Sequence, residues 1–238
     1  STSEVIVLLN PDAVVATDTL RALADQMQSE ATLGILAPAI VQPAGRLRIT
    51  SAGRFPTAWR MFTHYAGLSR YARRIPLLEG HYLRPEHVTG ECDTDWVTGA
   101  CLAMRRTVWD EIGGISRRWF MYAEDIDLCL RVKRAGYRVV LSPTWSANHL
   151  VGASESGHER RLNAAWVINL FDFYCLEFNP GPVRRSTWRL IVGIGLASRA
   201  VAYLLRARGP GRAAWRTEAR RFFFYAKATL TAKAGEHV

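Results

Sequence analysis

The chain has few cysteines and arranges none of them as a metal site or a disulfide framework. Its 238 residues include four, spread without a Cys-x-x-Cys pair or the Cys/His spacing of a zinc site. They are Cys92, Cys101, Cys129 and Cys175. Low-complexity tracts are also lacking, and 49% of the residues are hydrophobic, which predicts a sizeable core. The cysteine pattern argues against a disulfide-stapled secreted protein and favours a reducing cytosol.

Acidic residues are scarce in one part of the chain only. Residues 180–238 hold 12 Lys and Arg against two acidic residues, Glu218 and Glu236. Residues 1–179 hold 19 of each sign, so the whole net charge of +10 lies in the last part of the chain. The composition changes at Asn179-Pro180-Gly181-Pro182, a run that stops helices. We therefore predict two domains, 1–179 and 180–238.

Short apolar runs alternate with helical patterns over residues 1–178, which predicts an α/β architecture. Val5–Leu9 is continuously apolar, typical of a strand buried on both faces in the middle of a parallel sheet. The other expected strands are 33–37, 46–49, 96–104 and 138–141, and the expected helices begin near residues 17, 107, 124 and 160. Residues 53–92 read as a long irregular surface excursion, which in a compact domain is more often functional than idle.

The stretch FMYAEDIDLCLR, residues 120–131, places three carboxylates in four positions amid aromatic and aliphatic neighbours. On a helix that begins at Glu124, this first carboxylate lies in the first turn, where the helix dipole favours an anion. Asp127 then lies on a solvated face and can pair with Arg131. Asp125 instead heads the apolar stripe, either as a general base in a cleft or as a buried first-turn carboxylate. The direction of its pKa shift stays open, because burial raises the pKa and the helix N-terminus lowers it.

Three segments in order along the chain resemble the family 2 inverting glycosyltransferases of GT-A fold. They are LLNPDA at 8–13, WVTGACLAMRR at 96–106, and GG…FMYAEDIDLCLRVKRAGYRVVLSP at 113–143 with His149 beyond. They are most similar to bacterial rhamnosyltransferases of cell-wall and O-antigen assembly, over about residues 4–178. The resemblance implies the C-terminal portion of a GT-A mixed sheet flanked by helices. It also implies inverting transfer of a sugar from a nucleotide donor, for which dTDP-L-rhamnose is expected.

The resemblance assigns roles to matching residues. Asp12 stands in the DXD-type motif and, with His149, would bind Mg²⁺ or Mn²⁺ bridging the donor diphosphate. Asp125 matches the base that would deprotonate the acceptor hydroxyl, while the metal would stabilise the departing nucleoside diphosphate. The expected substrate-binding residues are Asn10, Trp96, Thr98, Gly99 and Glu124. Taken singly, each signal also has an ordinary explanation: a turn at 10–12, a satisfied histidine, or a tryptophan of the core.

The sequence departs from the family pattern in three places. Asn10 replaces the first acidic residue of the DXD-type motif, and Ile115-Ser116-Arg117-Arg118 replaces an acidic pair, which bears on acceptor choice. The family's first βαβ units, which hold the nucleobase and ribose, should precede Val5. We therefore expect the C-terminal portion of a longer protein, with weak binding of nucleotide sugars by this chain alone. The alternative function is a truncated, non-catalytic remnant that serves as a membrane- or partner-binding module.

The basic end of the chain combines apolar segments with arginines. Leu190–Leu205 is strongly apolar, but it contains Arg199 and is shorter than the roughly 20 residues of a spanning helix. Further on, four basic residues fall on one helical face: Arg212, Arg216, Arg220 and Lys227. We expect residues 184–233 to lie on an anionic membrane, in preference to binding nucleic acid or only packing on the domain. This predicts a peripheral enzyme at the cytoplasmic face of the plasma membrane, with a polyprenyl-diphosphate-linked saccharide as acceptor.

Overall fold

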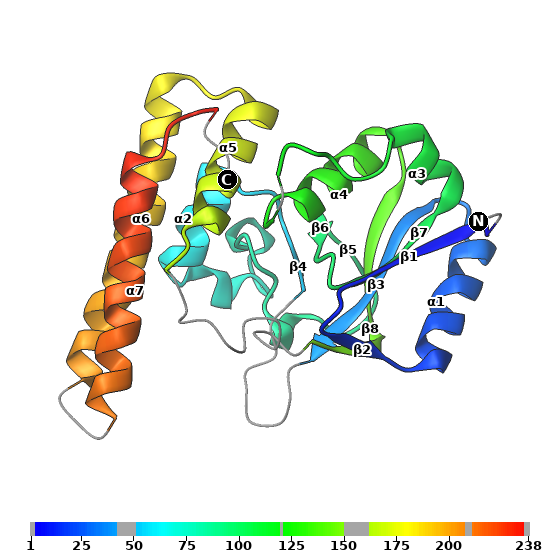
Figure 1. Ribbon diagram of the computed structural model, residues 1–238, viewed down its shortest axis with the longest axis horizontal. Helices are drawn as coiled ribbons and strands as arrows, with labels where there is room; N and C mark the ends of the chain where they lie inside the picture. The colour runs from blue at the N-terminus through cyan, green and yellow to red at the C-terminus, as the bar shows by residue number, and fades with distance from the viewer. Residues whose placement is uncertain (1–2, 42–50, 120, 150–161, 208–210, 236–238) are drawn as a thin grey trace. The chain divides into compact units, whose positions relative to one another are not determined.

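The computed structural model describes residues 3–41, 51–119, 121–149, 162–207 and 211–235 (Figure 1). The chain forms two compact units. Unit 1 comprises Ser1–Phe55, Tyr82–Arg117 and Glu124–Glu159, and unit 2 comprises Pro56–His81, Arg118–Ala123 and Arg160–Val238. The expected boundary near residue 179 falls inside unit 2, between two of its helices. The division by function at this boundary stays a prediction.

Unit 1 is built on a mixed sheet with the strand order β1-β7-β3-β8-β2, and β5 pairs with β8. Its strands are β1 (Val5–Leu9), β2 (Ala13–Val15), β3 (Leu33–Val41), β5 (Cys92–Asp93), β7 (Cys101–Arg105) and β8 (Arg138–His149). β3 and β8 run parallel, and the remaining pairs are antiparallel. The unit also holds α1 (Thr17–Ser29), α3 (Arg106–Ile112), α4 (Glu124–Arg134), the 3₁₀ helix η3 (Pro85–His87) and the two-stranded sheet of β4 (Ala52–Gly53) and β6 (Trp96–Val97). This mixed sheet with helices confirms the predicted α/β class.

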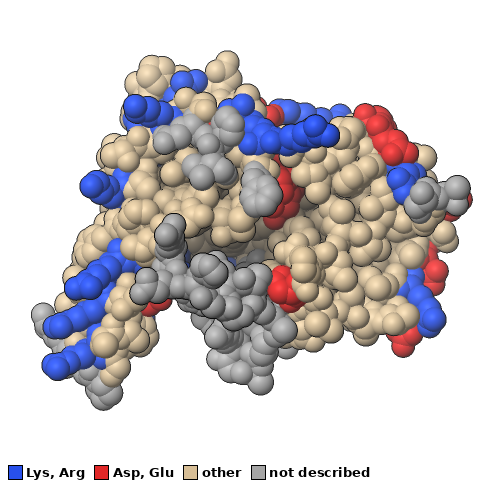
Figure 2. Space-filling model, in the orientation of Figure 1, with Lys and Arg blue, Asp and Glu red and all other residues tan. Residues whose placement is uncertain are grey.

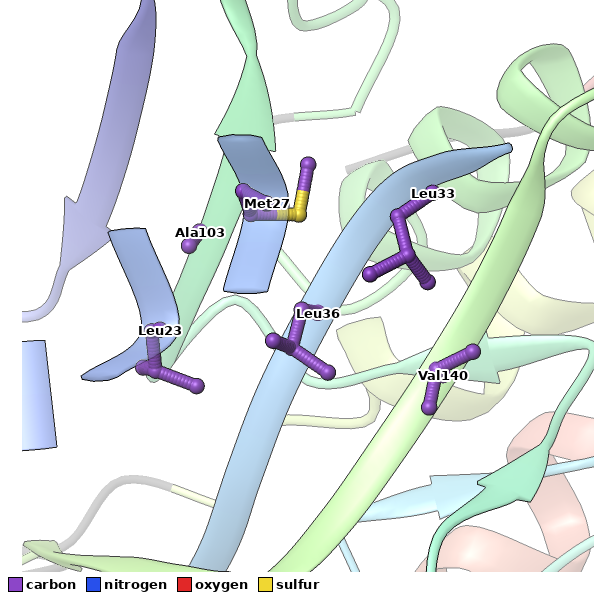
Figure 3. Close-up of a cluster of buried hydrophobic side chains, with 6 residues drawn as sticks. All are labelled: Leu23, Met27, Leu33, Leu36, Ala103 and Val140. Carbon is purple, nitrogen blue, oxygen red and sulfur yellow. The ribbon is translucent and has the colours of Figure 1, made fainter. Parts of the chain in front are cut away.

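The core of unit 1 forms where α1 packs on the sheet (Figure 3). Leu23 and Met27 lie four residues apart, so both point from α1 toward the strands. They meet Leu33 and Leu36 of β3, Ala103 of β7 and Val140 of β8, all of which are buried. Burial of a large aliphatic side chain contributes about 1.5–3 kcal/mol. This cluster therefore fixes β3, β7 and β8, of which β8 ends at His149 and β7 begins two residues after Gly99.

Two strand predictions were partly wrong. β1 pairs antiparallel with β7, and Val7 and Leu9 are 38% and 43% exposed, so β1 is not buried on both faces in a parallel sheet. The expected strand 96–104 is two strands in different sheets, β6 and β7. The break occurs because the N–H groups of Thr98 and Gly99 donate to Ser51 and Asp125 instead of to a neighbouring strand.

Other differences concern the lengths of elements. Residues 53–92 contain the helix α2 (Ala58–Tyr65), whose N-cap Thr57 accepts a hydrogen bond from the Arg60 N–H, so this region is less irregular than expected. β8 runs on to His149, where a loop was expected after residue 141. The expected strand at 46–49 lies outside the described residues.

Unit 2 is helical. Besides α2 it holds α5 (Ala165–Phe178), α6 (Pro182–Arg206), α7 (Arg212–Thr231) and two 3₁₀ helices, η1 (Leu68–Tyr71) and η2 (Pro76–Leu78). α6 and α7 form an antiparallel pair, because Tyr203 stacks on Trp215 at one end and Arg189 donates to the Ala232 carbonyl at the other. The expected helical tail is therefore present.

The apolar segment of the tail lies within a longer helix, so its shortness is no argument against a membrane span. The segment forms part of α6, a helix of 25 residues that is long and apolar enough to cross a membrane. About 28% of its most apolar window is buried inside the protein, and one such helix is weak evidence for a membrane span because core helices of soluble proteins also have this composition. Length alone does not decide how α6 is used.

A buried carboxylate organises another part of unit 2. Asp172 on α5 is 1% exposed and accepts two hydrogen bonds from the Arg118 guanidinium, at 2.8 and 3.0 Å. The indole N–H of Trp119 and the backbone N–H of Gly235 donate to the same carboxylate. Arg118 belongs to the run that replaces the family's acidic pair, so here this departure serves an internal ion pair.

Candidate active site

Asp125 lies in the first turn of α4, and backbone N–H groups hold its carboxylate. Oδ2 accepts from the Gly99 N–H at 3.3 Å, and Oδ1 accepts from the Ile126 N–H at 2.8 Å. The Thr98 side chain adds a further hydrogen bond. The residue is half-buried, and the residues expected on its face of α4, Leu128, Cys129 and Val132, are all buried. The sequence pattern therefore placed Asp125 correctly at the head of the apolar stripe.

The environment of Asp125 raises its pKa. Burial, which penalises the charged form, is the largest cause, and the hydrogen bonds from Gly99, Ile126 and Thr98 oppose it. This settles the direction that the sequence left open. A carboxylate with a raised pKa accepts a proton more readily than an ordinary aspartate, which is the property required of a general base.

The rest of α4 is locked in place by an ion pair. Asp127 Oδ2 accepts a hydrogen bond from the Nε–H of Arg131 at 2.9 Å and lies 2.8 Å from Nη2 of the same guanidinium, an ion pair that confirms the predicted pairing. Asp127 is only 5% exposed, however, so its expected place on a solvated face was wrong. The reason is that Arg131 also donates to the carbonyls of Ile112 and Gly114, which brings the end of α3 over this side of α4.

A tight turn after β1 presents Asp12 beside His149. The Ala13 N–H donates to the Asn10 carbonyl at 3.0 Å, which closes the turn between β1 and β2. β2 pairs with β8 so that Ala13 lies opposite His149. As a result, Asp12 Oδ1 and His149 Nε2 lie 3.0 Å apart, with side chains 15% and 20% exposed. The two expected metal ligands, 137 residues apart in sequence, are in contact.

Asp125 lies at the same end of the β1–β7 pair as the turn that carries Asp12. Leu9 is opposite Cys101 in the antiparallel register, and the next residue, Asn10, donates its N–H to the Ala100 carbonyl at 3.0 Å. The residue before Ala100 is Gly99, whose N–H holds Asp125. The turn and the carboxylate are therefore each hydrogen-bonded to the same short segment, Gly99–Ala100.

The donor chemistry of Asp12 and His149 suits a divalent cation. A carboxylate oxygen and an imidazole nitrogen are both metal donors, and such cations take further oxygen ligands from phosphates and water. Within the described residues no group of three or more His, Cys, Asp and Glu side chains is placed to hold a metal. Among the described residues, the pair would therefore supply two ligands of such a cation.

The other expected substrate-binding residues occupy different settings. Trp96 is 5% exposed, its indole N–H donates to the Arg54 carbonyl, and its ring packs edge-on against Tyr82, which fits its alternative as a core residue. Thr98, Gly99 and Glu124 are half-buried next to or near Asp125. Sequence reasoning did not identify Thr98 and Gly99 as partners of Asp125, because that contact joins segments 26 residues apart and depends on the break between β6 and β7.

Comparison with known proteins gives a consistent family. A family model described as "Glycosyl transferase family group 2" matches residues 5–224. An "N-acetylglucosaminyl-diphospho-decaprenol L-rhamnosyltransferase" of Mycobacterium tuberculosis is 31% identical over 144 residues, which are 60% of this chain and 46% of that protein. The "Rhamnosyltransferase WbbL" of Escherichia coli is 27% identical over 145 residues, 60% of this chain and 51% of the relative. This chain thus spans about half the length of these relatives.

Among solved structures, one described as "Crystal structure of GalNAc-T7 with UDP, GalNAc and Mn2+" covers 73% of this chain and 34% of its own, with 16% identity. Its TM-score is 0.44, so the likeness is distant and carries no weight for function. The family match and the mixed sheet flanked by helices agree with the expected GT-A fold class.

Proposed function

The chain belongs to glycosyl transferase family group 2, and from this premise we propose that it transfers a sugar from a nucleotide donor to a hydroxyl of a saccharide acceptor. The names of the two rhamnosyltransferase relatives support rhamnose as the sugar, and the family resemblance implies a dTDP-linked donor. The name of the mycobacterial relative supports an acceptor sugar carried on a polyprenyl diphosphate. Asp125 is the residue on which the proposal depends.

In the proposed reaction Asp125 takes the proton of the acceptor hydroxyl as that oxygen bonds to the anomeric carbon of the donor sugar. The bond from the anomeric carbon to the diphosphate oxygen breaks at the same time, and the configuration inverts because attack and departure occur on opposite faces. The nucleoside diphosphate leaves with the bonding electron pair. Asp125 ends protonated, which its raised pKa favours.

Asp12 and His149 are proposed to hold the donor diphosphate through a divalent cation, Mg²⁺ or Mn²⁺. When bound, such a cation supplies positive charge that neutralises the departing diphosphate. The protein supplies the rest of the site. The Asn10–Ala13 turn orients Asp12, and the pairing of β2 with β8 fixes His149 beside it.

The observation that carries this proposal is the setting of Asp125. It is a half-buried carboxylate with a raised pKa, held by Gly99 and Ile126, at the sheet end that also presents Asp12. A carboxylate that served only to cap a helix would be stabilised in its charged form by the helix N-terminus. Here burial outweighs the hydrogen bonds that Asp125 accepts, so its pKa is raised.

The test is a transfer assay with a set of nucleotide sugars and a polyprenyl-diphosphate-linked N-acetylglucosamine, in the protein that carries this chain. Asp125→Asn should reduce kcat by about 10²–10⁴-fold, because it removes a base, while KM for the donor changes little. The matched control is Asp110→Asn, an exposed carboxylate of α3 in the same unit. Undiminished transfer by the Asp125 variant would refute the assignment. Absence of transfer with every donor would favour the non-catalytic alternative.

A further inference from the structure

One face of α6 carries exposed apolar side chains along its whole length. The residues recur at intervals of three, four and seven, which places them on one stripe of the helix. They are Val183, Leu190, Ile194, Val201, Leu204 and Leu205. Val183 is 77% exposed and Ile194 is 62% exposed, so no other described residue covers this stripe substantially. A contiguous apolar surface of this kind marks an interaction site.

The opposite face of α6 is packed inside unit 2. Trp188 is fully buried, and its indole N–H donates to the Pro56 carbonyl at 2.7 Å. Gly195 lies so close to the Tyr65 ring of α2 that a Cβ there would clash, so glycine is needed for this approach. Arg199 also faces α2, 3.1 Å from His64 and over the Tyr65 ring. α6 is therefore anchored through one face and exposed on the other.

The neighbouring helix α7 adds positive charge. Arg212, Arg216, Arg220 and Lys227 are exposed, and none of the four makes an ion pair with another residue in the described part of the chain. Phe223 and Leu230 lie on the same side of α7 and are 42% and 44% exposed. Leu230 borders α6 at Gly193, the residue before Ile194, so this side of α7 adjoins the apolar stripe. Figure 2 shows Lys and Arg side chains along the helix pair.

We propose that this combined face, the apolar stripe of α6 with the basic side of α7, docks unit 2 onto an anionic membrane surface. Apolar side chains enter the boundary between headgroups and acyl chains, while arginine and lysine pair with anionic headgroups. The complementarity is strong, because unit 2 carries 19 Lys and Arg against 5 Asp and Glu. The inference does not depend on the proposed transfer reaction.

The packing of α6 favours a surface-lying helix over a spanning one. A spanning α6 would have to leave α2 and α7 and place Arg199 near the middle of the bilayer, where a charge is costly. A nucleic acid would use the basic residues of α7 but would leave the apolar stripe of α6 exposed to water. A second copy of the chain would bring two strongly positive faces together.

The test measures co-sedimentation of the whole 238-residue chain with vesicles of phosphatidylglycerol or of phosphatidylcholine, at low and high salt. We expect binding to the anionic vesicles only, weakened by salt. Arg216→Gln/Arg220→Gln should weaken binding about 30-fold, since each basic residue near an anionic surface contributes about 1 kcal/mol. Leu190→Gln/Ile194→Gln should weaken it about tenfold or more. Ile115→Gln and Arg21→Gln/Arg117→Gln, exposed positions of unit 1, are matched controls and should bind like the wild type.

Several results would overturn the proposal. Equal binding to both lipids, or no binding to either, would show that this face does not recognise an anionic membrane surface. Retention through high salt and alkaline carbonate would mean that α6 spans the bilayer. Tight binding of an oligonucleotide without vesicle binding would assign the face to nucleic acid, and a dimer disrupted by Leu190→Gln/Ile194→Gln would assign it to a second copy. Salt dependence of the wild type tests the idea even if a variant misfolds.

Discussion

The two units of this chain use charge in opposite ways. Unit 1 carries 12 Lys and Arg against 16 Asp and Glu, a net charge of −4, while unit 2 carries 19 against 5, a net charge of +14. In unit 1 two carboxylates are shielded from solvent and hydrogen-bonded within the protein. Asp125 accepts from Gly99, and Asp127 accepts from Arg131. In unit 2 exposed charges lie along α7, and among the Asp, Glu, Lys and Arg residues that the structure describes there Asp172 alone is deeply buried.

This difference suggests a division of labour. A shielded carboxylate with defined hydrogen bonds has a perturbed pKa and can do proton chemistry. Exposed arginines beside an apolar stripe are suited to binding an anionic surface. We therefore expect changes in unit 1 to affect chemistry and stability, and changes in the exposed face of unit 2 to affect location.

The largest expected effect tests whether the buried charges of unit 1 are structural. Arg131→Met leaves Asp127 without its ion pair in a buried position, and should lower the free energy of unfolding by about 3–5 kcal/mol. Urea unfolding followed by circular dichroism measures the change. Arg117→Met, at an exposed position of the same unit, is the control and should stay within about 0.5 kcal/mol of the wild type. Equal stability of both variants would show that the ion pair is dispensable.

The next largest effect is expected on metal binding by unit 1. Asp12→Ala removes an oxygen donor and should reduce Mn²⁺ affinity by about 100-fold, with a similar loss for His149→Ala, as followed by electron paramagnetic resonance of the free ion. Asp18→Ala, an exposed carboxylate of α1, should have no effect. Vesicle binding should be unchanged in all three variants. If neither substitution changed the Mn²⁺ affinity, the cation would have to bind at a site other than Asp12 and His149.

A smaller effect is expected where α6 contacts α2 in unit 2. Gly195→Ala adds a methyl group against the Tyr65 ring and should destabilise the protein by about 1–3 kcal/mol, because the helices must move apart. Gly181→Ala places its methyl group in open space, so it should cost only a few tenths of a kcal/mol as a change at the α6 N-cap. Thermal unfolding compares the two. A tolerated Gly195→Ala would mean that α6 is held less tightly than the structure shows.

The smallest expected effect is on the pH profile. A base must be deprotonated to act, so kcat/KM should fall as the pH drops through the raised pKa of Asp125, at a pH above the ordinary aspartate value. Thr98→Val removes a hydrogen bond that lowers this pKa and should therefore move the acidic limb to higher pH. Vesicle binding should not weaken over the pH range in which kcat/KM falls. An acidic limb unmoved by Thr98→Val would argue against Asp125 as the group that titrates.

Local patterns predicted much of unit 1. The spacing of the apolar residues predicted the helix α4 and the position of Asp125 on its buried face. The four-residue spacing of Asp127 and Arg131 predicted their ion pair. The contact of Asp12 with His149 followed only from the family resemblance, because nothing local links residues 137 apart. Its geometry comes from the β2–β8 register, which no sequence period encodes.

What could not be predicted depended on tertiary context. The apolar run of β1 does not reveal whether its neighbour is parallel or antiparallel, or how exposed each side chain will be. The break at Thr98–Ala100 is set by distant hydrogen-bond partners, Ser51 and Asp125. Asp127 is buried because α3 folds over it, although its position on α4 reads as solvated. The helix α6 is longer than the apolar segment Leu190–Leu205 because residues before and after that segment continue the helix.

The most direct test of the division between the two units compares two acceptors. Transfer would be measured to a short water-soluble saccharide diphosphate and to its polyprenyl counterpart in anionic vesicles, for the wild type, Asp125→Asn and Arg216→Gln/Arg220→Gln. We expect Asp125→Asn to lose transfer to both acceptors yet still bind vesicles. We expect the arginine variant to lose transfer only to the acceptor in the membrane. Loss of transfer to the soluble acceptor in the arginine variant, or loss of vesicle binding in Asp125→Asn, would refute the division between the two units.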